Sequence, residues 1–232
     1  QGPARNAGDD RCHDHRRGEP EADDAYEPND SQDAAPAMSR APPRTVTTSS
    51  PAPESTDHIK VKKRYGLFIG GGFPETRMQE LSANTAMREQ IRTAIDAGLP
   101  AYAECGGLMY LCRSLRWQGR QYEMAGVIPA DCVMHARPQG RGYVRLRETA
   151  AMPWAGPGPV GEIAAHEFHY SALENISGPL TFAYYVIRGA GIDGDHDGIV
   201  INNLLASYTH MRDTRQHHWA RRFVDYVRQC RD

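Results

Sequence analysis

The stretch PAYAECGGLMYL, Pro100 to Leu111, places a cysteine between an apolar segment and a pair of glycines. The glycines let the backbone turn sharply, and a helix that starts there points its first N–H groups at the sulfur of Cys105. A helix N-terminus favours the thiolate form, and a tight turn exposes it. The stretch therefore predicts a nucleophile at Cys105. The alternative is a small buried cysteine at a packed glycine turn.

The segments around this turn predict an α/β fold. YGLFI (65–69) is expected to form a buried strand, GGGFPE (70–75) a loop, and residues 77–97 a helix, because apolar residues recur there at helical spacing before Gly98. LPAYAE (99–104) is the next expected strand, and the helix after Cys105 is expected to run through Leu115. This alternation of strands and helices is typical of parallel α/β sheets.

The rest of the chain predicts shorter strands and a final helix. Strands are expected at 124–128, 142–146, 163–170 and 182–187, a loop at 189–198, and a return to the sheet at 199–208. A helix is expected at 214–230, because Trp219, Phe223, Val227 and Cys230 share one face. The chain as a whole predicts a three-layer α/β domain with a mixed, largely parallel sheet.

The first part of the chain differs in composition from the rest. In residues 1–58 the only large apolar side chains are Tyr26, Met38 and Val46, among many prolines and acidic residues. Such a segment cannot bury enough surface to offset its ordering entropy. We expect residues 1–58 to be disordered and residues 59–232 to form one domain of ordinary size.

Charge, hydropathy and cysteine content exclude several classes of function. A net charge of −2 and a pI near 6.6 give no electrostatic reason to expect a nucleic-acid partner. No apolar run approaches the roughly 20 residues that cross a bilayer, and no secretory signal opens the sequence, so no membrane partner is expected. The five cysteines are irregularly spaced and form no CxxC pair, which predicts no metal site and a reducing, cytoplasmic location.

Four motifs in register carry a resemblance to a known family. LFIGGGFPE, PAYAECGGLMYL, HEFHYS and NLLASYTH, in this order, resemble the glutamine amidotransferase domain of cobyrinic acid a,c-diamide synthases. The resemblance covers Tyr65 to about Val227 and implies a class I glutamine amidotransferase-like fold. It implies an enzyme that hydrolyses glutamine and supplies ammonia for ATP-dependent amidation of tetrapyrrole side-chain carboxylates in cobalamin biosynthesis.

The resemblance also implies roles for particular residues. Cys105 would attack glutamine, with His210 at the end of ASYTH as the base, and backbone N–H groups of Gly71 or Gly72, with Gly106, would bind the oxyanion. Many related amidotransferases orient this histidine with an acid two residues later, where this chain has Arg212. Strand alternation would point Glu104 away from Cys105, so we expect Glu104 to be structural and glutamine hydrolysis to be slow.

Three further features have competing interpretations. HEFH (166–169) lacks the histidine spacing of the zinc-binding helix of metalloproteases. On a strand His166 and His169 would face opposite sides, so we expect no metal there. One of the two is expected to border the glutamine or ammonia pocket. DGDHDG (193–198) imitates a calcium loop, but its twelfth position is Leu204 where a bidentate glutamate is required, so a solvated turn is expected at 193–198. Three arginines (Arg137, Arg141 and Arg145) form either an exposed basic strand and loop or a guide for a carboxylate-rich tetrapyrrole or a partner domain.

Parts of the resembled enzymes have no counterpart in this sequence. No GxxxxGK followed by Ser or Thr occurs, so no cofactor is expected in this chain, and ATP and Mg²⁺ are expected only on a separate ATP-binding domain or subunit that also holds the tetrapyrrole. The usual opening strand, helix and second strand before YGLFIGGG are also expected to be missing. This leaves two alternatives open: a sister activity that amidates sirohydrochlorin or siroheme, favoured by GIDGDHDGIV and HHWARRF, and a truncated remnant without turnover.

Overall fold

The computed structural model describes residues 65–156 and 161–230, all within the unit Asp57–Asp232. The segment 1–58, for which disorder is expected, lies outside the described residues. The domain boundary at residue 59 therefore stays a prediction.

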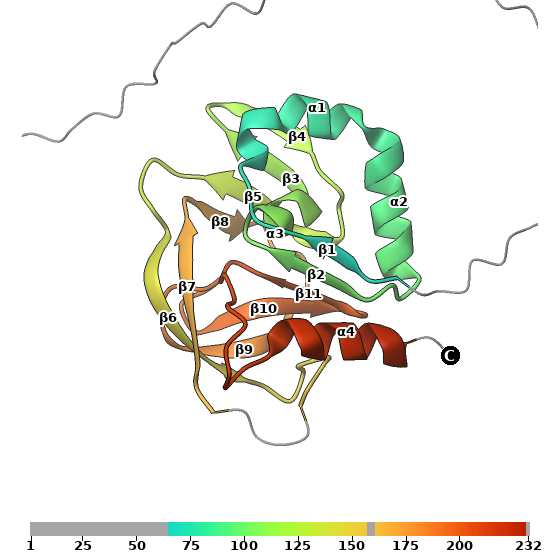
Figure 1. Ribbon diagram of the computed structural model, residues 1–232. Helices are drawn as coiled ribbons and strands as arrows, with labels where there is room; N and C mark the ends of the chain where they lie inside the picture. Colours follow the sequence, from blue (N-terminus) through green and yellow to red (C-terminus); the bar gives the residue numbers. More distant parts are fainter. Residues whose placement is uncertain (1–64, 157–160, 231–232) are drawn as a thin grey trace, which may run out of the picture. The chain divides into compact units, whose positions relative to one another are not determined.

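A seven-stranded mixed sheet forms the centre of the domain, in the order β1-β2-β11-β10-β9-β6-β7 (Figure 1). Its strands are β1 (Leu67–Ile69), β2 (Ala101–Glu104), β6 (Gly140–Glu148), β7 (Ile163–His169), β9 (Thr181–Arg188), β10 (His196–Ile201) and β11 (Leu204–Ser207). The predicted mixed α/β sheet is confirmed. However, only the pairs β1–β2 and β2–β11 are parallel, and the other neighbours are antiparallel. The expectation of a largely parallel sheet is thus correct only around Cys105.

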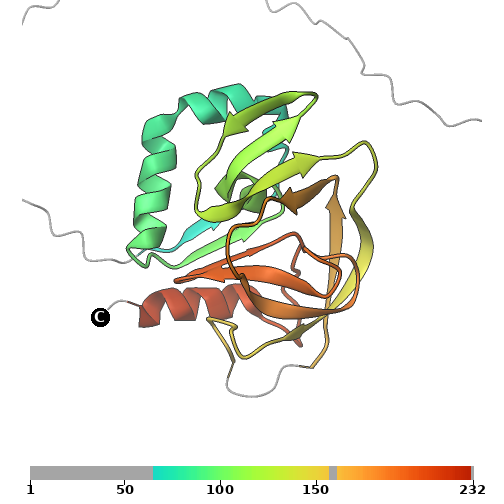
Figure 2. The same cartoon turned by 180° about the vertical axis from the view of Figure 1, so that it is seen from behind.

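Two apolar cores, one on each face of this sheet, give the predicted three layers. Along β2, Ala101 and Ala103 belong to one core, while Tyr102 between them belongs to the other, as strand alternation requires. Helix α3 (Gly106–Leu111) packs in the first core. Helix α4 (Trp219–Gln229) covers the opposite face, where Phe223 and Trp219 contact the ring of Tyr102 (Figures 1 and 2).

A second sheet replaces part of an expected helix. Its order is β4-β3-β5-β8, with β3 (Cys112–Trp117), β4 (Arg120–Glu123), β5 (Ile128–Met134) and β8 (Ser171–Glu174). The helix expected through Leu115 is wrong after Leu111, because Cys112 adopts extended geometry (ψ 167°). From there β3 pairs with β4 on one side and β5 on the other, which supplies the hydrogen bonds that the helix would have made. The strand expected at 124–128 is also wrong, since β5 begins only at Ile128.

The helix expected over 77–97 is divided into shorter pieces. A 3-10 turn (Pro74–Arg77) is followed by α1 (Met78–Ala83) and α2 (Thr85–Asp96). Asn84 separates the two α-helices, and its side-chain oxygen accepts a hydrogen bond from the N–H of Met87, which caps α2. The last helix begins at Trp219, five residues later than expected.

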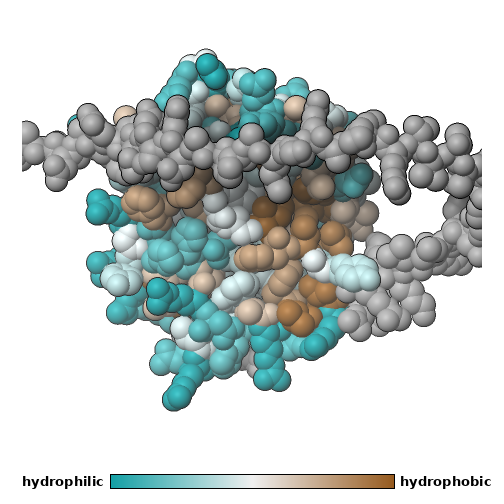
Figure 3. All heavy atoms as spheres, turned by 45° about the horizontal axis from the view of Figure 1, so that its top comes forward, coloured by the Kyte–Doolittle hydropathy of each residue, from teal (hydrophilic) through white to brown (hydrophobic). Residues whose placement is uncertain are grey.

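An apolar hollow of about 740 Å³ lies beside β1, α1, α2 and α3. Phe73, Pro74, Leu81, Met87 and Tyr110 contribute to its walls. Figure 3 shows apolar side chains gathered on the face that carries α1 and α2. Among the described residues no helix combines the length and apolar character needed to cross a membrane.

Candidate active site

Cys105 occupies the sharp turn between β2 and α3. Its backbone has φ 48° and ψ −102°, a left-handed conformation that is uncommon for a residue other than glycine. Its N–H donates to the carbonyl of Ser207 at 2.7 Å, which ties the turn to the end of β11. Cys105 is 7% exposed, and its Sγ lies 3.8 Å from the carbonyl oxygen of Phe168. Strained backbone at a cysteine is a common feature of functional sites.

The glycines expected to bind an oxyanion lie around this turn. A Cβ added at Gly106 would lie 2.5 Å from the carbonyl oxygen of Gly72, so α3 starts in direct contact with the glycine loop. A Cβ added at Gly71 would lie 3.1 Å from Cε1 of His210. The structure therefore brings Gly71, Gly72 and Gly106 into the same region as Cys105 and His210.

His210 reaches Cys105 because of the parallel pairing of β2 and β11. Ser207 pairs with Glu104 in the register of these strands, so the residues that follow each strand meet at one edge of the sheet. The imidazole is hydrogen-bonded to the carboxylate of Glu104. The neighbouring side chain of Cys105 and this bond to Glu104 together raise the pKa of His210 to about 10. A histidine with this pKa is protonated at neutral pH.

Glu104 is the acid that contacts His210, so the expectation that its side chain points away from the site is wrong. Its Oε1 lies 2.8 Å from Nδ1 of His210, while Oε2 accepts hydrogen bonds from the Tyr102 hydroxyl at 2.9 Å and the Met211 N–H at 3.2 Å. Burial alone would raise the pKa of Glu104, but the hydrogen bonds from His210, Met211 and Tyr102 outweigh burial and lower it. The alternation argument failed because Cys105 leaves the strand: its positive φ turns its side chain out of the pattern of β2.

The two histidines of HEFH lie on opposite faces of β7. The ring of His166 stacks on that of His210, with centroids 4.8 Å apart, and the two residues form an antiparallel bridge. His169 is buried on the other face, where its ring stacks on Tyr208 and its Nδ1 lies 2.8 Å from the carbonyl oxygen of Ser171. His166 thus borders the site directly, whereas His169 supports the segment that leads to His210.

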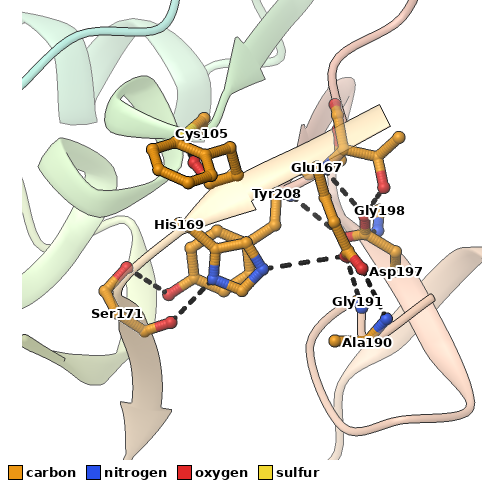
Figure 4. Close-up of polar contacts among 12 residues, drawn as sticks. Cys105, Glu167, His169, Ser171, Ala190, Gly191, Asp197, Gly198 and Tyr208 are labelled. Carbon is orange, nitrogen blue, oxygen red and sulfur yellow. Dashed lines mark hydrogen bonds and ion pairs between the residues drawn. The ribbon is translucent and has the colours of Figure 1, made fainter. Parts of the chain in front are cut away.

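Asp197 is hydrogen-bonded to the segment just before His210. The expectation of a solvated turn over 193–198 is therefore wrong for this residue. Its side chain is fully buried and accepts hydrogen bonds from the N–H groups of Gly198, Tyr208 and Thr209 and from the Thr209 hydroxyl (Figure 4). Burial raises the pKa of Asp197, and the four hydrogen bonds oppose that rise. The short β10–β11 hairpin, which folds Asp197 back onto Thr209, was not visible as a separate motif in the sequence.

Glu167 holds a second loop in the same network. Its carboxylate accepts hydrogen bonds from the N–H groups of Ala190 and Gly191, and it lies 3.8 Å from Nε2 of His169 (Figure 4). Arg212 is exposed and forms no side-chain ion pair among the residues that the structure describes. In this chain the carboxylate that contacts His210 is that of Glu104, from a neighbouring strand, and not a residue at position 212.

Comparison with known proteins identifies a family for this chain. Residues 45–216 match the model of the CobB/CobQ-like glutamine amidotransferase domain. The chain is 48% identical over 155 residues to a cobyrinate a,c-diamide synthase of Magnetococcus marinus, covering 67% of this chain and 33% of the relative, and 42% identical over 158 residues to that of Archaeoglobus fulgidus (68% and 34%). The chain thus spans about a third of the length of these relatives.

Solved structures show the same fold at low sequence identity. PurLQS from Thermotoga maritima matches with a TM-score of 0.53 at 12% identity, covering 72% of this chain and 80% of that one. A glutamine amidotransferase crystal structure matches with a TM-score of 0.50 at 16% identity, covering 70% and 78%. The motifs, the fold and the family match agree, and the chain belongs to the family of CobB/CobQ-like glutamine amidotransferase domains.

Proposed function

We propose that this domain hydrolyses glutamine at Cys105 and supplies the ammonia to a tetrapyrrole side-chain carboxylate during cobalamin biosynthesis. The observation that carries the proposal is the chain of contacts from Cys105 to His210 to Glu104 at the strand–helix turn. A nucleophile, a base within reach and an acid that orients the base are the parts that covalent catalysis of acyl transfer needs.

The first half of the reaction releases ammonia. The Cys105 thiolate attacks the side-chain carbonyl carbon of glutamine, and the carbonyl electrons move to oxygen. Backbone N–H groups of Gly72 and Gly106 are the proposed donors to this oxyanion. The His210 imidazolium then gives its proton to the departing nitrogen, the C–N bond breaks, and ammonia leaves a glutamyl thioester on Cys105.

The second half restores the site. Neutral His210 takes a proton from water, whose oxygen attacks the thioester carbon. The C–S bond breaks, glutamate leaves, and the thiolate and imidazolium are regenerated. Throughout, Glu104 fixes which imidazole nitrogen faces Cys105, because Nδ1 is held by the carboxylate and Nε2 is left for the sulfur and the substrate.

The acceptor half of the reaction is proposed to take place elsewhere. Amidation needs an activated carboxylate, and the sequence offers no phosphate-binding loop for the ATP and Mg²⁺ that would activate it, so a separate ATP-binding domain or subunit is the expected partner. The corrinoid acceptor is preferred to sirohydrochlorin or siroheme because the relatives at 48% and 42% identity are cobyrinate a,c-diamide synthases. A cytoplasmic location is part of the same proposal.

Glutamate release from glutamine by the full chain tests the hydrolytic step. We expect Cys105→Ala to abolish release and His210→Asn to lower its rate by about 10²–10⁴-fold, the usual contribution of a positioned acid–base group. The same substitution at His218 is the matched control, because His218 is exposed and pairs with Asp213 instead of contacting the candidate site. Release that persists in Cys105→Ala would contradict the proposal.

The same assay tests the alternative that this chain is a truncated remnant without turnover. The wild-type chain is measured alone and with a separately prepared ATP-binding subunit, ATP and a tetrapyrrole acceptor. We expect the partner to raise glutamate release and to yield an amidated acceptor. A background rate in both conditions would identify a remnant without turnover.

A further inference from the structure

A cavity of about 440 Å³ lies on the outer face of the β6–β7 ribbon. In the register of these strands Arg141 faces Phe168 and Tyr143 faces His166, so these four side chains share one face. Arg212, from the segment after His210, also lines the cavity. We call this space the β6–β7 cavity.

The β6–β7 cavity lies next to the candidate catalytic residues. Its wall residue His166 stacks on His210, and its wall residue Phe168 places its carbonyl oxygen 3.8 Å from Sγ of Cys105. A group bound in the cavity would therefore be close to the point at which ammonia is released.

Among residues 65–156 and 161–230, no ion pair neutralises the two arginines of the cavity. Within the described part of the chain neither Arg141 nor Arg212 forms an ion pair, whereas neighbouring carboxylates are already engaged. Glu162 pairs with Arg145, and Asp213 pairs with His218. Of the remaining nearby carboxylates, Glu167 points to the buried face and holds the N–H groups of Ala190 and Gly191, and Glu104 holds His210.

The pKa of His166 reflects the positive groups around it. Burial, the neighbouring His210 and the guanidinium of Arg212 all lower the pKa of His166, and Glu104 opposes them only in part. Two of the three groups that act on His166 by their charge, His210 and Arg212, are therefore positive.

The other walls of the cavity are aromatic and exposed. Tyr143 is 82% exposed and Phe168 is 47% exposed, although both are large apolar side chains next to a reaction site. Exposed aromatic faces bind flat ring systems, and guanidinium groups bind carboxylates through paired hydrogen bonds. The combination suits a planar molecule whose edge carries carboxylates.

We propose that the β6–β7 cavity binds a side-chain carboxylate of a flat polycarboxylate acceptor, through Arg141 and Arg212, with the ring system against Tyr143 and Phe168. The proposal rests on the proposed function, in which ammonia from Cys105 goes to such an acceptor. Binding there shortens the path from the ammonia source to the acceptor and favours transfer over loss to solvent.

Binding of uroporphyrin, a fluorescent porphyrin polycarboxylate, to the full chain tests the site. We expect Arg141→Gln and Arg212→Gln each to raise the dissociation constant by about tenfold, the effect of losing one charge-assisted contact. Arg137→Gln is the matched control, because Arg137 is an exposed arginine of the same segment outside the cavity walls. Arg137→Gln should change the dissociation constant by less than about twofold. Added salt should weaken porphyrin binding by the wild type more than porphyrin binding by Arg141→Gln or Arg212→Gln.

Two outcomes would overturn the proposal. Equal effects of all three arginine substitutions, or no effect of any, would mean that the porphyrin binds by general charge or elsewhere. Displacement of the porphyrin by free L-glutamate would mean that the arginines hold the α-carboxylate of an amino acid instead of an acceptor.

Glutamate release measured on the same wild-type preparation separates this proposal from the proposed function. Porphyrin binding that depends on the arginines, without glutamate release, would support the acceptor site and contradict the proposed glutamine hydrolysis. Glutamate release with porphyrin binding that ignores Arg141 and Arg212 keeps the function and rejects the site.

Discussion

The carboxylate of Glu104 lies 2.8 Å from Nδ1 of His210, although the two residues are 106 positions apart in the sequence. Glu104 is the last residue of β2, and His210 follows β11, the parallel strand next to β2. Cys105 comes directly after Glu104, at the turn between β2 and α3. The contact places an acid beside the histidine, in a chain whose residue 212 is an arginine. The lack of an acid near His210, which was the reason to expect slow glutamine hydrolysis, therefore does not apply. The rate of hydrolysis itself stays a prediction.

Replacing Glu104 with Gln should lower the rate of glutamate release by about 10²-fold or more, as removal of an orienting carboxylate does in other nucleophile–histidine pairs. The amide keeps the size of the side chain but loses the charge that stabilises protonated His210. The pKa of His210, followed by NMR of its ring, should fall from about 10 towards its ordinary value. Glu123→Gln, at a surface glutamate that pairs loosely with Arg88, is the control. An unchanged pKa of His210 in Glu104→Gln would show that the carboxylate does not act on the imidazole.

The raised pKa of His210 also predicts a pH dependence of stability. A histidine whose pKa is higher in the folded than in the unfolded state stabilises the fold fully below the unfolded value, and this contribution disappears as the pH rises through the folded value. For His210 the window runs from about 6.5 to about 10. The difference in Tm between wild type and His210→Asn should therefore be larger at the lower end of this window than at its upper end. A constant difference across the window would contradict the raised pKa.

Gly106→Ala should disrupt the site through packing. The new Cβ would meet the carbonyl oxygen of Gly72 at 2.5 Å and its nitrogen at 2.8 Å, so the glycine loop or α3 must move. Because a displacement of about 1 Å in an active site costs about 10²-fold in rate, we expect a loss of that order in glutamate release. Gly161→Ala is the control, since nothing lies within 4 Å of a Cβ there. Equal activity of the two variants would mean that this contact does not set the geometry of the site.

Asp197→Asn should destabilise the fold by about 2–4 kcal/mol, because the new amide group would face N–H and O–H donors that now have a carboxylate to bind. Chemical denaturation measures this loss. Asp195→Asn, at an exposed aspartate of the same loop, should change stability by less than about 0.5 kcal/mol. A similar small effect of both substitutions would show that the buried Asp197 does not organise the segment before His210.

The sequence predicted the turn at Cys105 and the two flanking elements because strong local signals lie there: an apolar strand, a glycine pair and a short helix. It did not predict the role of Glu104, since alternation along β2 says nothing about a following residue with positive φ. Nor did it predict the position of Asp197, whose partners Tyr208 and Thr209 come to it only when β10 pairs with β11. The helix expected through Leu115 failed for a related reason: non-local pairing with β4 and β5 outweighs the helical continuation.

The central claim is that Cys105 carries the glutamyl group, and mass spectrometry of the chain quenched in acid during glutamine turnover tests it most directly. The account predicts a glutamyl adduct on the peptide that contains Cys105, absent in Cys105→Ala, with the peptides of Cys112 and Cys132 unmodified because both side chains are buried. An adduct on another residue, or glutamate release without any adduct on Cys105 while Cys105→Ala retains full activity, would contradict it.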